Sequence, residues 1–83
     1  MWTLKVRDSF QIKGRGLVVT GDLHADTEPQ VGPCSIALPD GHIFEDYVRG
    51  WDRFAIVEWW KRPAGALLRR AQTVPIGSVL RGY

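Results

Sequence analysis

Apolar and polar residues alternate along the first part of the chain. From position 2 to position 12 the odd positions are polar, and every even position except Asp8 is apolar. A period of two is typical of a strand with one face buried, so the pattern predicts a strand over 2–13. The residues expected on its buried face are Trp2, Leu4, Val6, Phe10 and Ile12. Asp8 interrupts that face, and its carboxylate must accept hydrogen bonds, from backbone amides or from Arg15, or serve a ligand.

A Gly-Arg-Gly turn separates this strand from a second one, which is predicted over 16–24 and is rich in β-branched residues. Gly14 and Gly16 allow the tight turn, and Arg15 between them is expected to donate to carbonyl groups and fasten it. Gly21, inside the second strand, indicates a bulge or a close approach of two backbones. The two segments together predict a β-hairpin.

Shorter strands with turn signals between them follow the hairpin. Pro39-Asp40-Gly41 and Gly50-Trp51-Asp52 are predicted as turns, with Trp51 shielding one end of the fold. The segment 63–71 is predicted as a loop or a single helical turn. The further strands are predicted over 34–38, 42–48, 53–60 and 78–81. Six short strands indicate an all-β fold that closes into a small antiparallel barrel, since closure removes exposed strand edges.

Length and composition indicate one soluble domain over residues 1–83. The chain has 83 residues and a net charge of +2, and it lacks a run of about 20 apolar residues that could cross a membrane. The N-terminus lacks a basic segment followed by an apolar run, so no signal peptide is expected. Cys34 is the only cysteine, which excludes an intramolecular disulfide and favours a cytoplasmic location.

Charge is unevenly distributed along the chain. Residues 31–60 hold five acidic and two basic residues, whereas residues 61–83 hold five basic residues and no acidic one. A basic C-terminal third can meet phosphate or an acidic protein, or it can form a solvated face that balances the acidic middle.

The hairpin sequence from Asp8 to Gly21, D-S-F-Q-I-K-G-R-G-L-V-V-T-G, resembles the start of domain 2 of elongation factor Tu and related translational GTPases. Weaker matches to the same domain are Val31-Gly32, Val57-Glu58-Trp59-Trp60-Lys61, Ile76-Gly77 and Leu80-Arg81-Gly82, so the resemblance spans nearly the whole chain. It implies a six-stranded Greek-key barrel. The chemistry of that family belongs to a separate GTPase domain with a phosphate-binding loop, and no G-x-x-x-x-G-K-[ST] motif is present here. We therefore expect no GTP binding by this chain alone.

The resemblance also implies a pocket for the aminoacyl end of transfer RNA. Asp8, Phe10 and Trp60 stand at positions that contribute to this pocket in the family. Arg7 replaces a family glutamate, and Pro75 stands where the family has an asparagine.

Two adjacent tryptophans are the strongest candidates for a partner surface. On the strand predicted over 53–60, Trp59 and Trp60 must point to opposite faces, and both faces are apolar. One face cannot line the barrel, so it is either covered by 62–72 or offered to a partner. The basic residues Lys61, Arg62, Arg69 and Arg70 could share that surface, and a cation beside an aromatic ring suits RNA or an acidic protein.

No catalytic, cofactor-binding or metal-binding constellation is evident in the sequence. His24, His42 and Cys34 are too scattered for a metal site, and Cys34 is expected to be a small buried hydrophobe. Asp40, Glu45 and Asp46 are expected at turns, solvated or capping them. The resulting hypothesis is a closed six-stranded Greek-key barrel without enzymatic activity that binds another protein or a second copy of itself. The alternative is a module that binds transfer RNA or ribosomal RNA.

Overall fold

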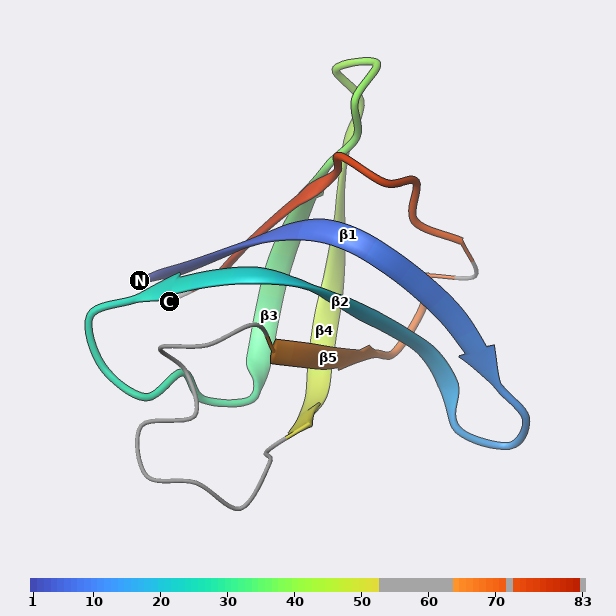
Figure 1. Ribbon diagram of the computed structural model, residues 1–83, viewed down its shortest axis with the longest axis horizontal. Coiled ribbons are helices and arrows are strands. Elements are labelled where there is room, and N and C mark those ends of the chain that lie inside the picture. Colours follow the sequence, from blue (N-terminus) through green and yellow to red (C-terminus); the bar gives the residue numbers. More distant parts are fainter. Residues whose placement is uncertain (53–63, 72, 83) are drawn as a thin grey trace.

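All regular secondary structure in the described residues is β-strand. The computed structural model describes residues 1–52, 64–71 and 73–82. The strands are β1 (Trp2–Ile12), β2 (Gly16–Ala25), β3 (Gly32–Ala37), β4 (Ile43–Asp52), β5 (Ala64–Leu68) and β6 (Val79–Gly82). They pair antiparallel in the closed order β1-β2-β5-β4-β3-β6 (Figure 1). The prediction of an all-β, closed six-stranded antiparallel barrel is confirmed.

Strands β3 to β6 follow a Greek-key path. Neighbouring strands β3, β4 and β5 are consecutive in the chain, and β6 returns to lie beside β3. The returning segment runs along β1, where the amide of Val6 donates to the carbonyl oxygen of Ser78 at 2.8 Å and the amide of Gly77 donates to the carbonyl oxygen of Val6 at 2.9 Å. The hydroxyl of Ser9 donates to the carbonyl oxygen of Val74 at 3.1 Å. The residues from 74 to 78, which precede β6, therefore extend the contacts of β6 along β1.

A β-bulge at Arg7 divides β1 into two halves. Val6 pairs with Gly21 of β2 and Asp8 pairs with the next residue, Thr20, so Arg7 is an extra residue without an opposite partner. One inserted residue exchanges the faces of all the side chains that follow it, because side chains alternate along a strand. The residues before and after Arg7 must therefore be assigned to faces separately.

The bulge turns Phe10 and Ile12 out of the barrel. Leu4 and Val6, which precede it, are buried in the core, whereas Phe10 is 47% exposed and Ile12 is half-buried. The prediction that Phe10 and Ile12 share the buried face is wrong, because it continues a period of two across the inserted residue. Asp8 is also exposed on the outside.

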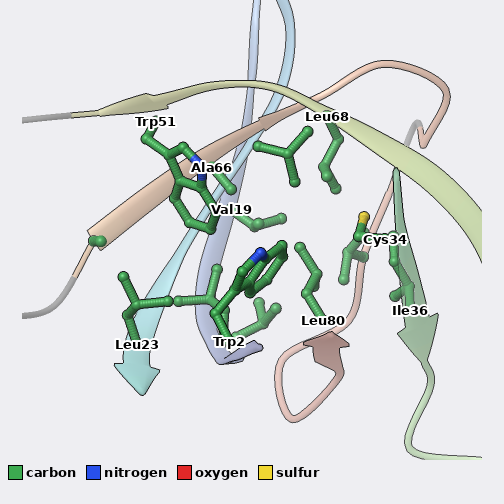
Figure 2. Packing of buried hydrophobic residues seen from close by; sticks show 14 of the residues in the cluster. Trp2, Val19, Leu23, Cys34, Ile36, Trp51, Ala66, Leu68 and Leu80 are labelled. Atoms are coloured by element: carbon green, nitrogen blue, oxygen red, sulfur yellow. The ribbon is translucent and has the colours of Figure 1, made fainter. Parts of the chain in front are cut away.

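Two tryptophans pack against each other in the core of the barrel. The rings of Trp2 and Trp51 meet edge to face, with centroids 4.8 Å apart and planes at 86° (Figure 2). The indole nitrogen of Trp51 donates to the carbonyl oxygen of Gln30 at 3.1 Å. The prediction that Trp51 lies in a turn is wrong, since it lies within β4 and its side chain is buried in the core. Other buried residues of this core are Leu4, Val6, Val19, Leu23, Ile36, Val48, Ala66, Leu68 and Leu80.

Two predicted element boundaries in the second half of the chain are also wrong. Strand β4 continues through Gly50 to Asp52, with a second irregularity between Val48 and Gly50. The segment 63–71, predicted as a loop or helical turn, contains β5, whose alanines and leucines fit between β2 and β4. The strand predicted over 53–60 lies outside the described residues. Within the described part of the chain, no helix is long and apolar enough to cross a membrane.

Asp46 is a buried carboxylate that holds the chain where it leaves β5. It is 5% exposed, and its two oxygens accept hydrogen bonds from the amides of Tyr47, Arg70 and Ala71 at 2.7, 2.9 and 2.7 Å. A buried carboxylate is tolerated where several donors satisfy it. The prediction that Asp46 is solvated or caps a turn is wrong, because it bonds to residues more than 20 positions away.

Gly21 makes the bulge possible by bringing β1 and β2 close together. A Cβ atom at Gly21 would overlap the carbonyl oxygen of Lys5, which belongs to the opposite strand. The predicted close backbone approach at Gly21 is therefore confirmed. By contrast, a Cβ at Gly50 would have no heavy atom within 4 Å.

Substitution of Gly21→Ala should lower the free energy of unfolding by about 1–3 kcal/mol, because the strands must separate to admit the methyl group. Gly50→Ala is the matched control and should change it by less than about 0.5 kcal/mol. Urea unfolding followed by tryptophan fluorescence measures both. Equal stability of the two variants would contradict the close approach.

Candidate binding surface

The outer face of β1, β2, β5 and β4 carries side chains in three rows that run across the strands. The register places Phe10 opposite Val18, Val18 opposite Leu67 and Leu67 opposite Gly50. These residues form the central row, which is apolar. Because opposite residues in an antiparallel sheet share a face, the rows on either side follow from the same pairings.

The central row borders a hollow of about 300 Å³. Phe10, Ile12, Val18 and Leu67 supply hydrocarbon to its wall, and Gly50 leaves space because it has no side chain. Arg15 and Asp52 contribute the charged part of the lining, and Trp51 also reaches it. A concave apolar surface with a few polar groups at its border is typical of a binding site. We call this hollow with its charged border the outer hollow.

Basic residues gather on the side of the outer hollow next to the β1–β2 turn. Arg15 lines the hollow, and a guanidinium nitrogen of Arg49 donates to the carbonyl oxygen of Arg15 at 3.2 Å. Arg69 follows β5 on the same face, with its guanidinium carbon 5.9 Å from the centre of the Tyr47 ring. The amide of Arg69 donates to the carbonyl oxygen of Tyr47 at 3.1 Å, so backbone pairing continues past β5. Arg15 is thus the arginine that lines the hollow, Arg49 is joined to it by a hydrogen bond, and Arg69 lies beyond the hollow where the backbone of β5 continues.

Acidic residues occupy the opposite side of the outer hollow. Asp8 of β1 pairs with Thr20, Thr20 pairs with Gly65, and Gly65 pairs with Asp52. Asp8 and Asp52 thus lie at the two ends of the row beyond Phe10 and Leu67, and both are exposed. The face changes from acidic through apolar to basic along the direction of the strands.

The hairpin residues singled out in the sequence have different roles in the structure. The carboxylate of Asp8 accepts a hydrogen bond from the amide of Ser9 at 2.8 Å, which confirms the expected bond to a backbone amide. The turn at Arg15 is closed by its backbone amide, which donates to the carbonyl oxygen of Ile12 at 2.9 Å, while its side chain borders the outer hollow. Arg15 therefore belongs both to the turn and to the lining of the outer hollow.

Only part of the predicted partner surface falls within the described residues. Trp59, Trp60, Lys61 and Arg62 lie outside them. Arg69 and Arg70 are both exposed, but only Arg69 follows the row pattern of the outer face, whereas the amide of Arg70 is bound by Asp46.

Leu67, Gly50 and Arg49 were not predicted as site residues. The segment of Leu67 has the composition of a loop or short helix, and Arg49 and Gly50 adjoin the irregularity in β4. The one available signal was Gly50 itself, since a glycine inside a strand often marks a bulge.

Other groups that could carry chemistry are separate from the outer hollow. Among residues 1–52, 64–71 and 73–82, no group of three or more His, Cys, Asp or Glu side chains could hold a metal ion. The amide and imidazole of His42 hydrogen-bond to Asp40 and lower the pKa of its carboxyl group. Asp40 therefore caps its turn, as predicted.

Cys34 lies in the core and borders a small hollow of about 140 Å³ with Ser35, Glu45 and Arg81. Burial, together with the negative charges of Asp46 and Glu45, raises the pKa of the Cys34 thiol to about 12. The expectation of a small buried hydrophobe is confirmed. The thiolate is the reactive form of cysteine, so native Cys34 is poorly nucleophilic.

No family model matches this sequence, and the search of curated proteins finds no match either.

Alkylation of Cys34 should be slow in the folded protein. At pH 8 a pKa of about 12 leaves roughly a thousandfold less thiolate than an ordinary cysteine has, and burial restricts access further. Iodoacetamide labelling followed by intact-mass spectrometry should therefore show little product in buffer and complete labelling in 8 M urea at about the same pH. Rapid labelling under native conditions would contradict the burial of Cys34.

Proposed function

We propose that this barrel is a non-catalytic binding module that recognises another protein, or a second copy of itself, through the outer hollow. The observation that carries the proposal is the apolar row of Phe10, Val18 and Leu67, which does not belong to the core cluster: Phe10 is 47% exposed, Leu67 is half-buried and Val18 is 8% exposed. An exposed aromatic ring beside half-buried aliphatic side chains around a concavity favours association. The mainly hydrocarbon lining suits recognition, because it offers anchorage for an apolar side chain.

A second candidate function is RNA binding related to the translation-factor resemblance. Phe10, which the resemblance associates with the aminoacyl pocket, lines the outer hollow next to Arg15. An aromatic ring beside a guanidinium can stack an unpaired base and contact its phosphate. Asp8 and Asp52 on the opposite border, and a net charge of only +2, favour a protein partner over a polyanion.

Filling the outer hollow tests the proposed site without disturbing the core. A leucine side chain at Gly50 would enter open space, since a Cβ there meets no heavy atom within 4 Å. Gly50→Leu should keep the unfolding midpoint close to that of Gly50→Ala and should lose the ligand. A protein ligand is sought by capture on the immobilised barrel. Self-association is measured by sedimentation of the free barrel.

We expect the wild-type barrel and Gly50→Ala to bind a protein or to form a dimer, and we expect this association to be at least about tenfold weaker with Gly50→Leu. Equal association of all three would rule out the outer hollow as the site. Ile43→Ser, which removes an isoleucine that is 68% exposed on β4, controls for general surface stickiness and should have no effect. Binding of transfer RNA that weakens steeply with salt and is lost in Gly50→Leu would favour the second candidate.

A further inference from the structure

The distribution of charge around the outer hollow specifies the chemistry of the partner. Resting on the proposed function, we propose that the hollow receives an extended peptide segment that has an apolar side chain with an acidic residue on one side of it only. The apolar side chain occupies the hollow above Gly50, against the side chains of Leu67 and Phe10 that line it. The acidic residue faces Arg15, Arg49 and Arg69.

The three arginines have no carboxylate partner within the described part of the chain. The ion pairs found there are Arg7 with Asp22 at 2.8 Å and His42 with Asp40 at 2.9 Å. Arg49 donates to a carbonyl oxygen and Arg69 lies over the Tyr47 ring, so both are held in place by neutral groups. Positioned guanidinium groups without a counter-ion are ready to bind a carboxylate, and Arg can do so with two parallel hydrogen bonds.

The opposite border of the hollow makes the preference one-sided. Asp8 and Asp52 would lie beside any acidic residue placed on that side of the apolar anchor and would repel it. A partner with acidic residues on both sides therefore binds less well than one with acid on the arginine side alone. A basic residue on the aspartate side is compatible with the same surface.

The spacing of the rows sets the spacing in the partner. Side chains on one face of a strand repeat every two residues, which is about 6.7 Å. Adjacent rows of the outer face are one such repeat apart, as Asp8, Phe10 and Ile12 show along β1. An extended peptide lying along the strands matches this spacing when its acidic residue is two positions from its apolar residue.

The test uses a display library of random 12-residue peptides selected on the intact barrel, followed by titration of the best synthetic peptides. Enriched peptides should share an aromatic or large aliphatic residue with Asp or Glu two positions away on one side. Arg15→Glu and Arg69→Glu should each weaken binding at least about tenfold, and the peptide with Lys in place of its acid should recover affinity for Arg15→Glu. Arg81→Glu, the same charge change on β6, should leave binding within about twofold.

The outcomes separate this inference from the proposed function. Two results would overturn the inference and leave the proposed function intact. In the first, the peptides lose binding to Gly50→Leu but share no acidic residue; in the second, Arg15→Glu and Arg69→Glu leave their binding unchanged. Peptides that bind equally to the wild-type barrel and to Gly50→Leu would count against both, whereas the absence of any enriched peptide would overturn the inference and leave the proposed function intact. Binding of a single-stranded oligonucleotide that is lost in Gly50→Leu, with no peptide bound at the same surface, would assign the surface to RNA and overturn the inference.

Discussion

The close approach of two backbones at Gly21 is the constraint on which the rest of the molecule depends. Because Gly21 has no side chain, β2 can lie against the carbonyl group of Lys5, and β1 accommodates Arg7 as an extra residue opposite it. The bulge divides β1 into two halves. The first half pairs with β6 and closes the barrel, while the second half pairs with the part of β2 that also pairs with β5. It also decides which side chains become core and which become surface.

The candidate binding surface is a direct consequence of that bulge. If β1 alternated regularly through Arg7, without the bulge, Phe10 would point inward with Leu4 and Val6, and the outer face would carry polar residues instead. With it, Phe10 joins Val18 and Leu67 outside, and the irregularity in β4 places Gly50 opposite Leu67. Two local departures from regular pairing thus produce an apolar hollow bordered by arginines on one side and aspartates on the other. Its chemistry suits recognition of a partner that combines an apolar anchor with an acid.

Much of the fold could be predicted from the sequence, because local signals agree with it. The alternation from Trp2 to Val6, the β-branched residues of 16–24 and the glycines of the turn each specify their own conformation. The closed barrel followed from the number of short strands. Strand β5 could not be recognised, because A-G-A-L-L has no β-branched residue and depends on its neighbours β2 and β4 for its conformation. The site could be predicted only in part, since it depends on two bulges whose positions follow from pairing across strands.

The orientation of Phe10 is the claim that can be tested most directly, by measuring the free energy of unfolding of Phe10→Ser in urea beside Leu4→Ala. If Phe10 lies on the outer face, its replacement should cost less than about 1.5 kcal/mol, whereas Leu4→Ala should cost about 2–5 kcal/mol because Leu4 is fully buried. A cost of about 3 kcal/mol or more for Phe10→Ser, similar to that of a core residue, would show that Phe10 points inward and would contradict the bulge, the apolar row and the surface built on it.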